Sequence, residues 1–209
     1  MAAITAPMSI ENVKDAILQL LRGVNREGME NLIQFLLKSD FFTAPASTKF
    51  HLACEGGLAR HSLNVYYRLI SIITSEKDMY GLDEVTFQRY MESAPIIALL
   101  HDICKTGFYK PSTRNVKNEE TGKWEKVPCY TIENQLPYGH GEKSVYMLSG
   151  FISLTREEAL AIRWHMGGFD DAVRGGSFDL TAVYNNYPIA VMLHTADVMA
   201  SYLDEAAEK

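Results

Sequence analysis

The sequence predicts an all-α protein, a helical bundle that carries one small β-hairpin insertion. Along most of the chain, apolar residues recur at steps of three or four, the spacing that buries one face of a helix. Residues typical of helix caps stand before several of these stretches. Residues 107–136 interrupt the helical spacing, and a glycine there separates two short strand-like runs.

The first half of the chain is expected to form four helices. They cover residues 9–23, residues 26–38, a stretch that follows Gly56-Gly57, and residues 84–103 approximately. Ser9 is a suitable N-cap for the first helix, and Pro45 marks a loop after the second. In the third and fourth helices, His61 and His101 fall on the apolar stripe, which places both imidazoles inside the core.

The second half begins with the hairpin and continues with helices. In order, the expected elements are strands at 109–116 and 124–132, a helix near 141–153, a helix that carries His165 and ends at Gly167-Gly168, an Asp- and Gly-rich loop, and a last helix near 188–206. The glycine of Glu-Glu-Thr-Gly-Lys supplies the hairpin turn. Thr155 and Glu158 form a capping box at the start of the helix that carries His165. Pro188 suits the first turn of the last helix.

Length and composition fit a single domain over residues 1–209. Apolar residues make up 47% of the chain and charged residues 22%, which is ordinary for a globular protein. A chain of this length can bury roughly 70% of the surface that its unfolded form exposes. We expect an N-terminal helical extension at 1–45 and a core at 46–209, with the inserted ribbon at about 107–136.

Charge and cysteine usage limit the partners and the location. The formal net charge of −6 disfavours duplex nucleic acid, because phosphate backbones require a basic surface, but it allows a small anionic substrate. Cys54, Cys104 and Cys129 show no disulfide framework, and the N-terminus lacks a signal-like apolar core. No apolar stretch reaches the ~20 residues of a membrane span. We therefore expect a cytoplasmic protein with reduced thiols and no membrane partner, and the sequence is compatible with a homo-oligomer.

Six residues able to bind a metal recur along the chain. Four of its six histidines belong to this series. In chain order the candidates are His61, His101, Asp102, His140, His165 and Asp197. Imidazole nitrogens and carboxylate oxygens together suit divalent first-row metals such as Mn, Fe, Co, Ni or Zn. The series therefore predicts a metal site.

The local contexts support these assignments, although each has a simpler alternative. Asp197 lies in a helix that is apolar on nearly all sides, where a carboxylate needs a cation, a salt bridge or hydrogen bonds. His140 begins a helix, whose positive end favours a neutral, ligating ring, and an exposed loop histidine is the alternative. His194 and Cys104 are interpreted as core packing, and His51 has either a substrate contact or a structural role.

These motifs resemble the HD superfamily of metal-dependent phosphohydrolases, over about residues 50–203. The segments that carry the likeness are Gly-Gly-Leu-Ala-Arg-His-Ser-Leu-Asn-Val around His61, Leu-Leu-His-Asp-Ile-Cys-Lys at His101-Asp102, and His-Thr-Ala-Asp ending at Asp197. Locally the chain is most similar to the HD domain of bacterial 3′-to-5′ exoribonucleases, without room for their OB-fold module. Cys104 stands where the family often has glycine, and the ribbon at 107–136 matches no named subfamily.

The resemblance implies an HD-domain helical bundle with a binuclear metal site. The residues that match the family's ligands for a first metal are His61, His101, Asp102 and Asp197. His140 and His165 match the further ligands of a second metal, with Asp102 bridging the two ions. The expected cofactors are two divalent ions, drawn from Mn, Fe, Mg, Ni or Zn.

The implied activity is that of a metal-dependent phosphohydrolase or phosphodiesterase. Metal-activated water would hydrolyse a small phosphorylated substrate, a nucleotide or a related phosphate ester. Asp102 and Lys105 would be catalytic, and Lys105 is placed to reach a substrate phosphate. Lys143 and Arg163 are further candidates for substrate binding, and a solvated charge is the alternative for Lys105. An HD-fold di-iron oxygenase, which uses the same ligand order, and a non-catalytic HD-like binding module are the alternative functions.

The inserted ribbon starts five residues after Asp102, so its base should lie beside the site. Its aromatic and basic residues could stack a base and bind phosphates, which would make the ribbon a lid over a nucleotide. They are Tyr109, Lys110, Arg114, Lys117, Lys123, Trp124 and Lys126. A surface ribbon with solvated charges is the alternative.

Overall fold

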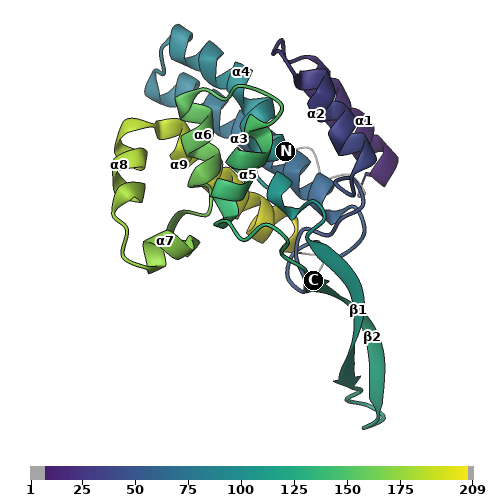
Figure 1. Cartoon of the computed structure of the whole chain (residues 1–209). Coiled ribbons are helices and arrows are strands. Elements are labelled where there is room, and N and C mark those ends of the chain that lie inside the picture. Colours follow the sequence, from purple (N-terminus) through teal and green to yellow (C-terminus); the bar gives the residue numbers. More distant parts are fainter. Residues whose placement is uncertain (1–7, 207–209) are drawn as a thin grey trace.

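The computed structural model describes residues 8–206, which are mostly helical and include one two-stranded antiparallel sheet (Figure 1). The longer elements are α1 (Ile10–Arg22), α2 (Met29–Lys38), α3 (Gly57–Tyr80), α4 (Glu84–Leu100), β1 (Tyr109–Lys117), β2 (Trp124–Ile132), α5 (His140–Ser149), α6 (Arg156–Arg163), α8 (Asp179–Asn186) and α9 (Pro188–Met199). The shorter ones are η1 (Ile103–Lys105), η2 (Gly167–Phe169), α7 (Asp171–Arg174) and η3 (Ala200–Asp204). This confirms the prediction of a helical protein with a hairpin; the two ends of the predicted 1–209 domain lie outside the described residues.

The capping signals in the sequence form the expected hydrogen bonds. The hydroxyl of Ser9 accepts the backbone N–H of Asn12 at 3.2 Å and caps α1. At the start of α6, the Thr155 hydroxyl accepts the Glu158 N–H at 3.2 Å, and the Glu158 carboxylate accepts the Thr155 N–H at 2.8 Å. Pro188 lies in the first turn of α9. These caps satisfy backbone N–H groups that have no partner within the first turn of a helix. They confirm where the sequence predicts these helices to begin.

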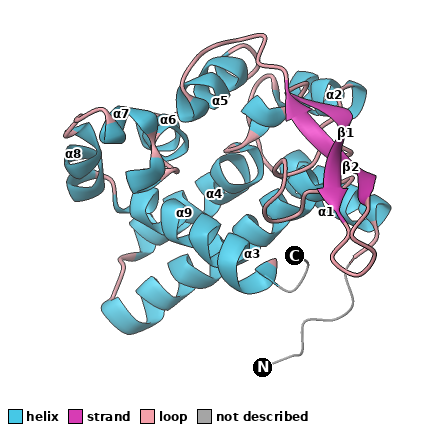
Figure 2. Ribbon diagram, turned by 90° about the horizontal axis from the view of Figure 1, so that it is seen from below, coloured by secondary structure: helices cyan, strands magenta, loops and turns pink. Residues whose placement is uncertain are grey.

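The core is built around α3, which packs against both α4 and α9 (Figure 2). Leu69 of α3, Ile97 of α4 and Leu193 of α9 are fully buried there. Ile17 of α1 and Leu32 of α2 belong to the same buried apolar cluster. The described part of the N-terminal extension therefore shares one core with the rest of the chain.

The hairpin forms where the sequence predicts it and projects away from the bundle (Figure 1). Its strands pair from Tyr109 opposite Ile132 to Lys117 opposite Trp124. Gly122 in the turn has a φ of +68°, a left-handed conformation that glycine adopts without strain. Most residues of both strands are exposed, so the ribbon adds little to the core.

From α4 onward, the structure differs from the prediction at several helix ends. α4 stops at Leu100, where the chain turns into η1, so His101 and Asp102 lie just beyond the helix. The prediction of a loop after Gly168 is wrong, because this stretch forms the short helices α7 and α8. α7 has four residues and α8 buries only Val183, so neither produces a recognisable apolar period. α9 ends at Met199 and continues as the π-helical turn η3.

Within residues 8–206, no helix combines the length and the apolarity that a membrane span requires. α3 is long enough at 24 residues, but Arg60, Arg68 and Lys77 interrupt its sequence. α9 is apolar but has 12 residues, well short of the ~20 that cross a bilayer.

Glu158 links the N-terminal part of the chain to α6, and we expect its loss to destabilise the protein. Its buried carboxylate accepts hydrogen bonds from Arg26 at 2.5 and 3.1 Å and from the Ser93 hydroxyl at 3.0 Å. Glu158→Ala removes the carboxylate that pairs with Arg26 and half of the capping box, so the free energy of unfolding should fall by about 3 kcal/mol or more. Urea unfolding followed by circular dichroism measures this. Glu11→Ala, which removes an exposed pair with Lys14, should leave the urea midpoint nearly unchanged; equal midpoints for the two variants would contradict the prediction.

Candidate metal centre

The six predicted ligands lie together where α3, α4, α5, α6 and α9 meet. His61 lies within α3 and Asp197 within α9. His101 and Asp102 follow the last turn of α4. His140 is the first residue of α5, and His165 follows the end of α6. Most of them are inaccessible to solvent. The exposed fraction is 1% for His61, 0% for His101, 2% for Asp102 and 0% for His165.

His101 and His165 are oriented in the same way by the backbone. Each follows a helix and donates its Nδ1–H to the carbonyl three residues earlier, to Ala98 at 2.8 Å and to Ile162 at 2.7 Å. Carbonyls in the last turn of a helix lack an amide partner within the helix, so the imidazoles satisfy them. With Nδ1 bonded to the backbone, each ring directs its Nε2 toward the centre.

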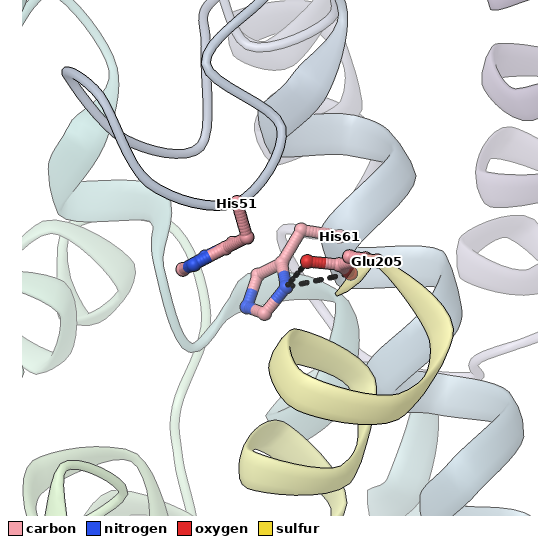
Figure 3. Close-up of side chains that lie close together, drawn as sticks. All are labelled: His51, His61 and Glu205. Carbon is pink, nitrogen blue, oxygen red and sulfur yellow. Dashed lines mark hydrogen bonds and ion pairs between the residues drawn. The ribbon is translucent and has the colours of Figure 1, made fainter. Parts of the chain in front are cut away.

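His61 is held from behind by a carboxylate that the sequence analysis did not identify. Its Nδ1 lies 3.0 and 3.3 Å from the two oxygens of Glu205, and Asn64 donates to the same carboxylate at 3.0 Å (Figure 3). His51 lies beside the same ring, with the ring centroids 5.0 Å apart. Glu205 comes about two helical turns after Asp197, which is the one signal in the sequence that could have indicated it.

His140 reaches the centre because α5 packs closely on the end of α6. A Cβ on Gly141 would overlap the carbonyl oxygen of Arg163, so a larger residue there would push α5 away. The Nε2 atom of His140 lies 2.7 Å from Oδ1 of Asp102. Its Nδ1 atom lies 3.3 Å from the sulfur of Cys104, which is buried.

The Asp102 carboxylate is the common contact of the cluster. From Oδ1, the distances are 2.7 Å to Nε2 of His140 and 3.6 Å to Nε2 of His165. From Oδ2, they are 2.7 Å to Nζ of Lys105, 3.4 Å to Nε2 of His101 and 3.8 Å to Nε2 of His61. Asp197 is connected to this cluster through His61, because Oδ1 of Asp197 lies 3.2 Å from Nε2 of His61.

Both carboxylates stay ionised although they are surrounded by protein. Burial raises the pKa of Asp102, but the Lys105 ammonium and the neighbouring imidazoles outweigh burial and hold this pKa well below its usual value. Burial also opposes the ionisation of Asp197, but the hydrogen bond with His61 outweighs the effect of burial and lowers the pKa of Asp197. For His61, burial lowers the pKa, while Glu205 and Asp197 together raise it to about 10. A cation binding here would have to displace that proton.

Two buried imidazole nitrogens indicate whether a metal ion suits this cluster. Nε2 of His101 and Nε2 of His165 are buried and have no hydrogen-bond partner among the described residues. Buried polar atoms are normally paired, so these two nitrogens leave room for a further partner. Burial lowers the pKa of His165, which keeps that ring neutral. A divalent cation would bind both nitrogens and the carboxylate at once, so these residues could hold a metal ion.

The donor atoms form overlapping groups of three, within which all donors lie no more than 4.8 Å apart. The groups at the centre are His61–His101–Asp197, His101–Asp102–His165 and Asp102–Cys104–His140. A further group joins His51 and Glu205 to His61. All six predicted ligands therefore belong to at least one such group, and Cys104 joins them.

A cleft of about 600 Å³ opens beside this cluster. Its lining includes the ligands His61, Asp102 and Asp197, and also His51 and His194. Two cationic side chains, Lys105 and Arg174, line it as well. Exposed aromatic side chains complete the lining: Phe50, Phe169 and Tyr202 are 63%, 54% and 61% exposed. The cleft thus combines metal ligands, positive charge and aromatic surface.

Two further residues named from the sequence lie outside this cleft. The buried Lys143 ammonium donates to the side-chain oxygen of Asn134 at 3.3 Å. Arg163 forms ion pairs with Asp170, at 2.8 Å, and with Glu142. The Lys143 ammonium and the Arg163 guanidinium are thus both paired with other side chains of the protein. Their role in substrate binding stays a prediction. Sequence reasoning missed Arg174, because its helix α7 lies in the stretch predicted as a loop.

The two remaining histidines support the cluster from its edge. His194, interpreted from the sequence as core packing, is half-buried and donates its Nδ1–H to the backbone carbonyl of His165 at 2.7 Å. His51 lies in the loop before α3, where burial and the charge of His61 lower its pKa to about 4. It is therefore neutral near pH 7.

The structure does not place the ribbon over the cleft. Residues 107–136 are all described, and none of them lines the cleft. The ribbon's base instead borders a separate groove with the 48–54 loop, while its tip projects from the bundle (Figure 1). This arrangement favours a surface ribbon over a lid.

Comparisons with protein-family models, with curated proteins and with solved structures found no match. The resemblance to the HD superfamily therefore stays a prediction. What supports a function is the geometry of the residues themselves.

Glu205 should strengthen metal binding without contacting the ion. It fixes the proton of His61 on Nδ1 and leaves Nε2 for a metal, so Glu205→Gln should weaken zinc binding by about 10- to 100-fold. Isothermal titration calorimetry against a competing chelator measures the dissociation constant. Asp204→Asn is the matched control, because this neighbouring carboxylate pairs with Arg68. If both variants bind zinc like the original chain, Glu205 does not position His61.

Proposed function

We propose that this chain is a metal-dependent phosphohydrolase or phosphodiesterase of HD-superfamily type, which hydrolyses a nucleotide or a related phosphate ester. The observation that carries the proposal is the convergence of buried, unpaired imidazole nitrogens on Asp102 beside an open cleft. A cluster that served only packing would pair its polar atoms with one another. It would also have no need of a cleft that reaches its carboxylates.

The donor set suits two ions that share one carboxylate. The first would be held by His61, His101, Asp102 and Asp197, and the second by Asp102, His140 and His165. The candidate ions are Mn, Fe, Mg, Ni and Zn, since nitrogen and oxygen donors accept all of them. When bound, such ions lower the pKa of water and offset charge on phosphoryl oxygens.

The cationic side chains of the cleft would bind the ester. Lys105 lies 2.7 Å from Asp102, so a phosphate beside the metal ligands would come within its reach. Arg174 lines the same cleft from α7 and can offer two N–H groups to one phosphate. These two positive charges act locally, and they explain how a chain with a net charge of −6 could accept an anion.

The aromatic lining supports a substrate that carries a planar ring. Phe50, Phe169 and Tyr202 present exposed rings beside the cleft, and nucleotide bases stack on such rings. The cleft of about 600 Å³ falls within the usual range for small-molecule sites. A mononucleotide or a short oligonucleotide end fits these features better than a duplex.

The proposal predicts that the purified chain contains divalent metal and hydrolyses phosphate esters. A panel of nucleotides and short oligonucleotides, tested with Mn, Mg, Ni, Zn and Fe, should show release of phosphate or nucleoside. Asp102→Ala should lose metal and turnover together, because it removes the shared carboxylate, whereas the exposed Asp78→Ala should retain both. Full metal content in Asp102→Ala would refute the bridging role.

Other outcomes of the same experiment would favour the alternative functions. Oxygen consumption by an iron-loaded protein, with no ester hydrolysed, would favour a di-iron oxygenase. A chain that folds but binds none of these metals would favour a non-catalytic binding module. Elemental analysis of the purified protein separates these cases before any substrate is known.

Arg174 should affect substrate binding more than turnover. Its guanidinium contacts no predicted metal ligand, so Arg174→Ala should raise KM about tenfold or more and change kcat little. Steady-state kinetics on the best ester of the panel measures both constants. Arg22→Ala, at the end of α1, is the control, because it removes the same positive charge at another place in the protein. An unchanged KM in Arg174→Ala would exclude this residue from the substrate site.

A further inference from the structure

Cys104 lies inside the ligand cluster and not in an apolar pocket. It is 2% exposed, and its sulfur lies 3.3 Å from Nδ1 and 3.8 Å from Nε2 of His140. The same Nε2 atom is 2.7 Å from Oδ1 of Asp102. Sulfur, imidazole nitrogen and carboxylate oxygen therefore surround a common point, with all donors within 4.8 Å.

The position of the sulfur is fixed by the backbone. Cys104 belongs to η1, the short turn that directly follows Asp102, so one short backbone segment positions both residues. The N–H of Cys104 donates to the Ser144 hydroxyl at 3.3 Å, which ties η1 to α5, the helix that carries His140. The three donors are thus held by two elements that are joined to each other.

A buried nitrogen without a partner faces the Asp102 carboxylate of this group. His165 is fully buried, and its Nε2 has no hydrogen-bond partner among residues 8–206. That nitrogen faces the Asp102 oxygen that also contacts His140, at 3.6 Å. His165 is grouped with His101 and Asp102, and Asp102 also belongs to the group of Cys104 and His140. Sulfur, imidazole nitrogen and carboxylate oxygen are all donors that zinc accepts.

We propose that the Cys104 sulfur is a ligand of the ion held by Asp102 and His140, and that it makes this half of the centre prefer zinc, cobalt or iron over magnesium or manganese. The proposal rests on the metal centre proposed above. On binding, the metal replaces the proton of the thiol, which leaves to solvent. Thiolate ligands select such softer ions, whereas oxygen-rich sites suit Mg and Mn.

Cobalt(II) titration tests the ligand directly, because a cobalt–thiolate bond gives a near-ultraviolet charge-transfer band that nitrogen and oxygen ligands do not give. The chain has three cysteines, so the double variant Cys54→Ser/Cys129→Ser retains Cys104 alone. This variant and the original chain should both show the band at saturating cobalt. Cys104→Ser should lose it while keeping the visible cobalt bands of the remaining ligands.

Metal preference gives a second readout that does not depend on activity. The ratio of zinc to manganese affinity should fall about tenfold or more in Cys104→Ser relative to the original chain. If cobalt binds to the double variant without the charge-transfer band, the sulfur is not a ligand, and the inference fails while the metal centre stands. If cobalt does not bind to the folded original chain at all, the proposed function fails as well. The double variant decides the question even where Cys104→Ser does not fold.

Discussion

The burial of one ionised carboxylate, Asp102, is the constraint on which the centre of this structure depends. A carboxylate that is 2% exposed is costly unless other groups offset its charge. Lys105 does so directly, and His140, whose pKa is raised to about 10 by Cys104 and Asp102 against the effect of burial, does so from α5. α3, α4, α5 and α6 each direct an imidazole at Asp102, whereas α9 contributes a second carboxylate, Asp197, which contacts His61. The carboxylate and imidazoles gathered here could also hold a metal ion, which would have to displace the extra protons of His61 and His140.

Most of these groups come from helix ends and not from helix faces. His101 and His165 each bond back to the final turn of the preceding helix, so one hydrogen bond satisfies a carbonyl and also fixes the ring. His140 stands at the opposite kind of end, the start of α5. The hairpin is inserted between η1 and α5, yet its strands pair with each other and project from the bundle, and the Tyr109 hydroxyl at its base donates to the Ala46 carbonyl at 3.4 Å.

The sequence predicts which side chains cluster because imidazoles and carboxylates are rare on apolar stripes. His61 and Asp197 stand out for that reason, and local caps identify α1 and α6. The groups behind the ligands are harder to predict. Glu205 lies in a polar stretch that resembles a solvated end, and only the turn η3 directs it to His61. The place of Cys104 depends on how η1 packs against α5, a tertiary contact that no local pattern encodes.

The two halves of the centre differ in their access to the cleft, and this difference has a chemical consequence. His61, Asp197 and the shared Asp102 are among the described residues that line the cleft, whereas Cys104 and His140 are not. Under the proposal of two ions, a phosphate entering the cleft meets the nitrogen- and oxygen-bound ion first, together with Lys105. Cys104 and His140 would bind away from that cleft, and Asp102, which belongs to both donor groups, would link their ion to the one that faces the substrate.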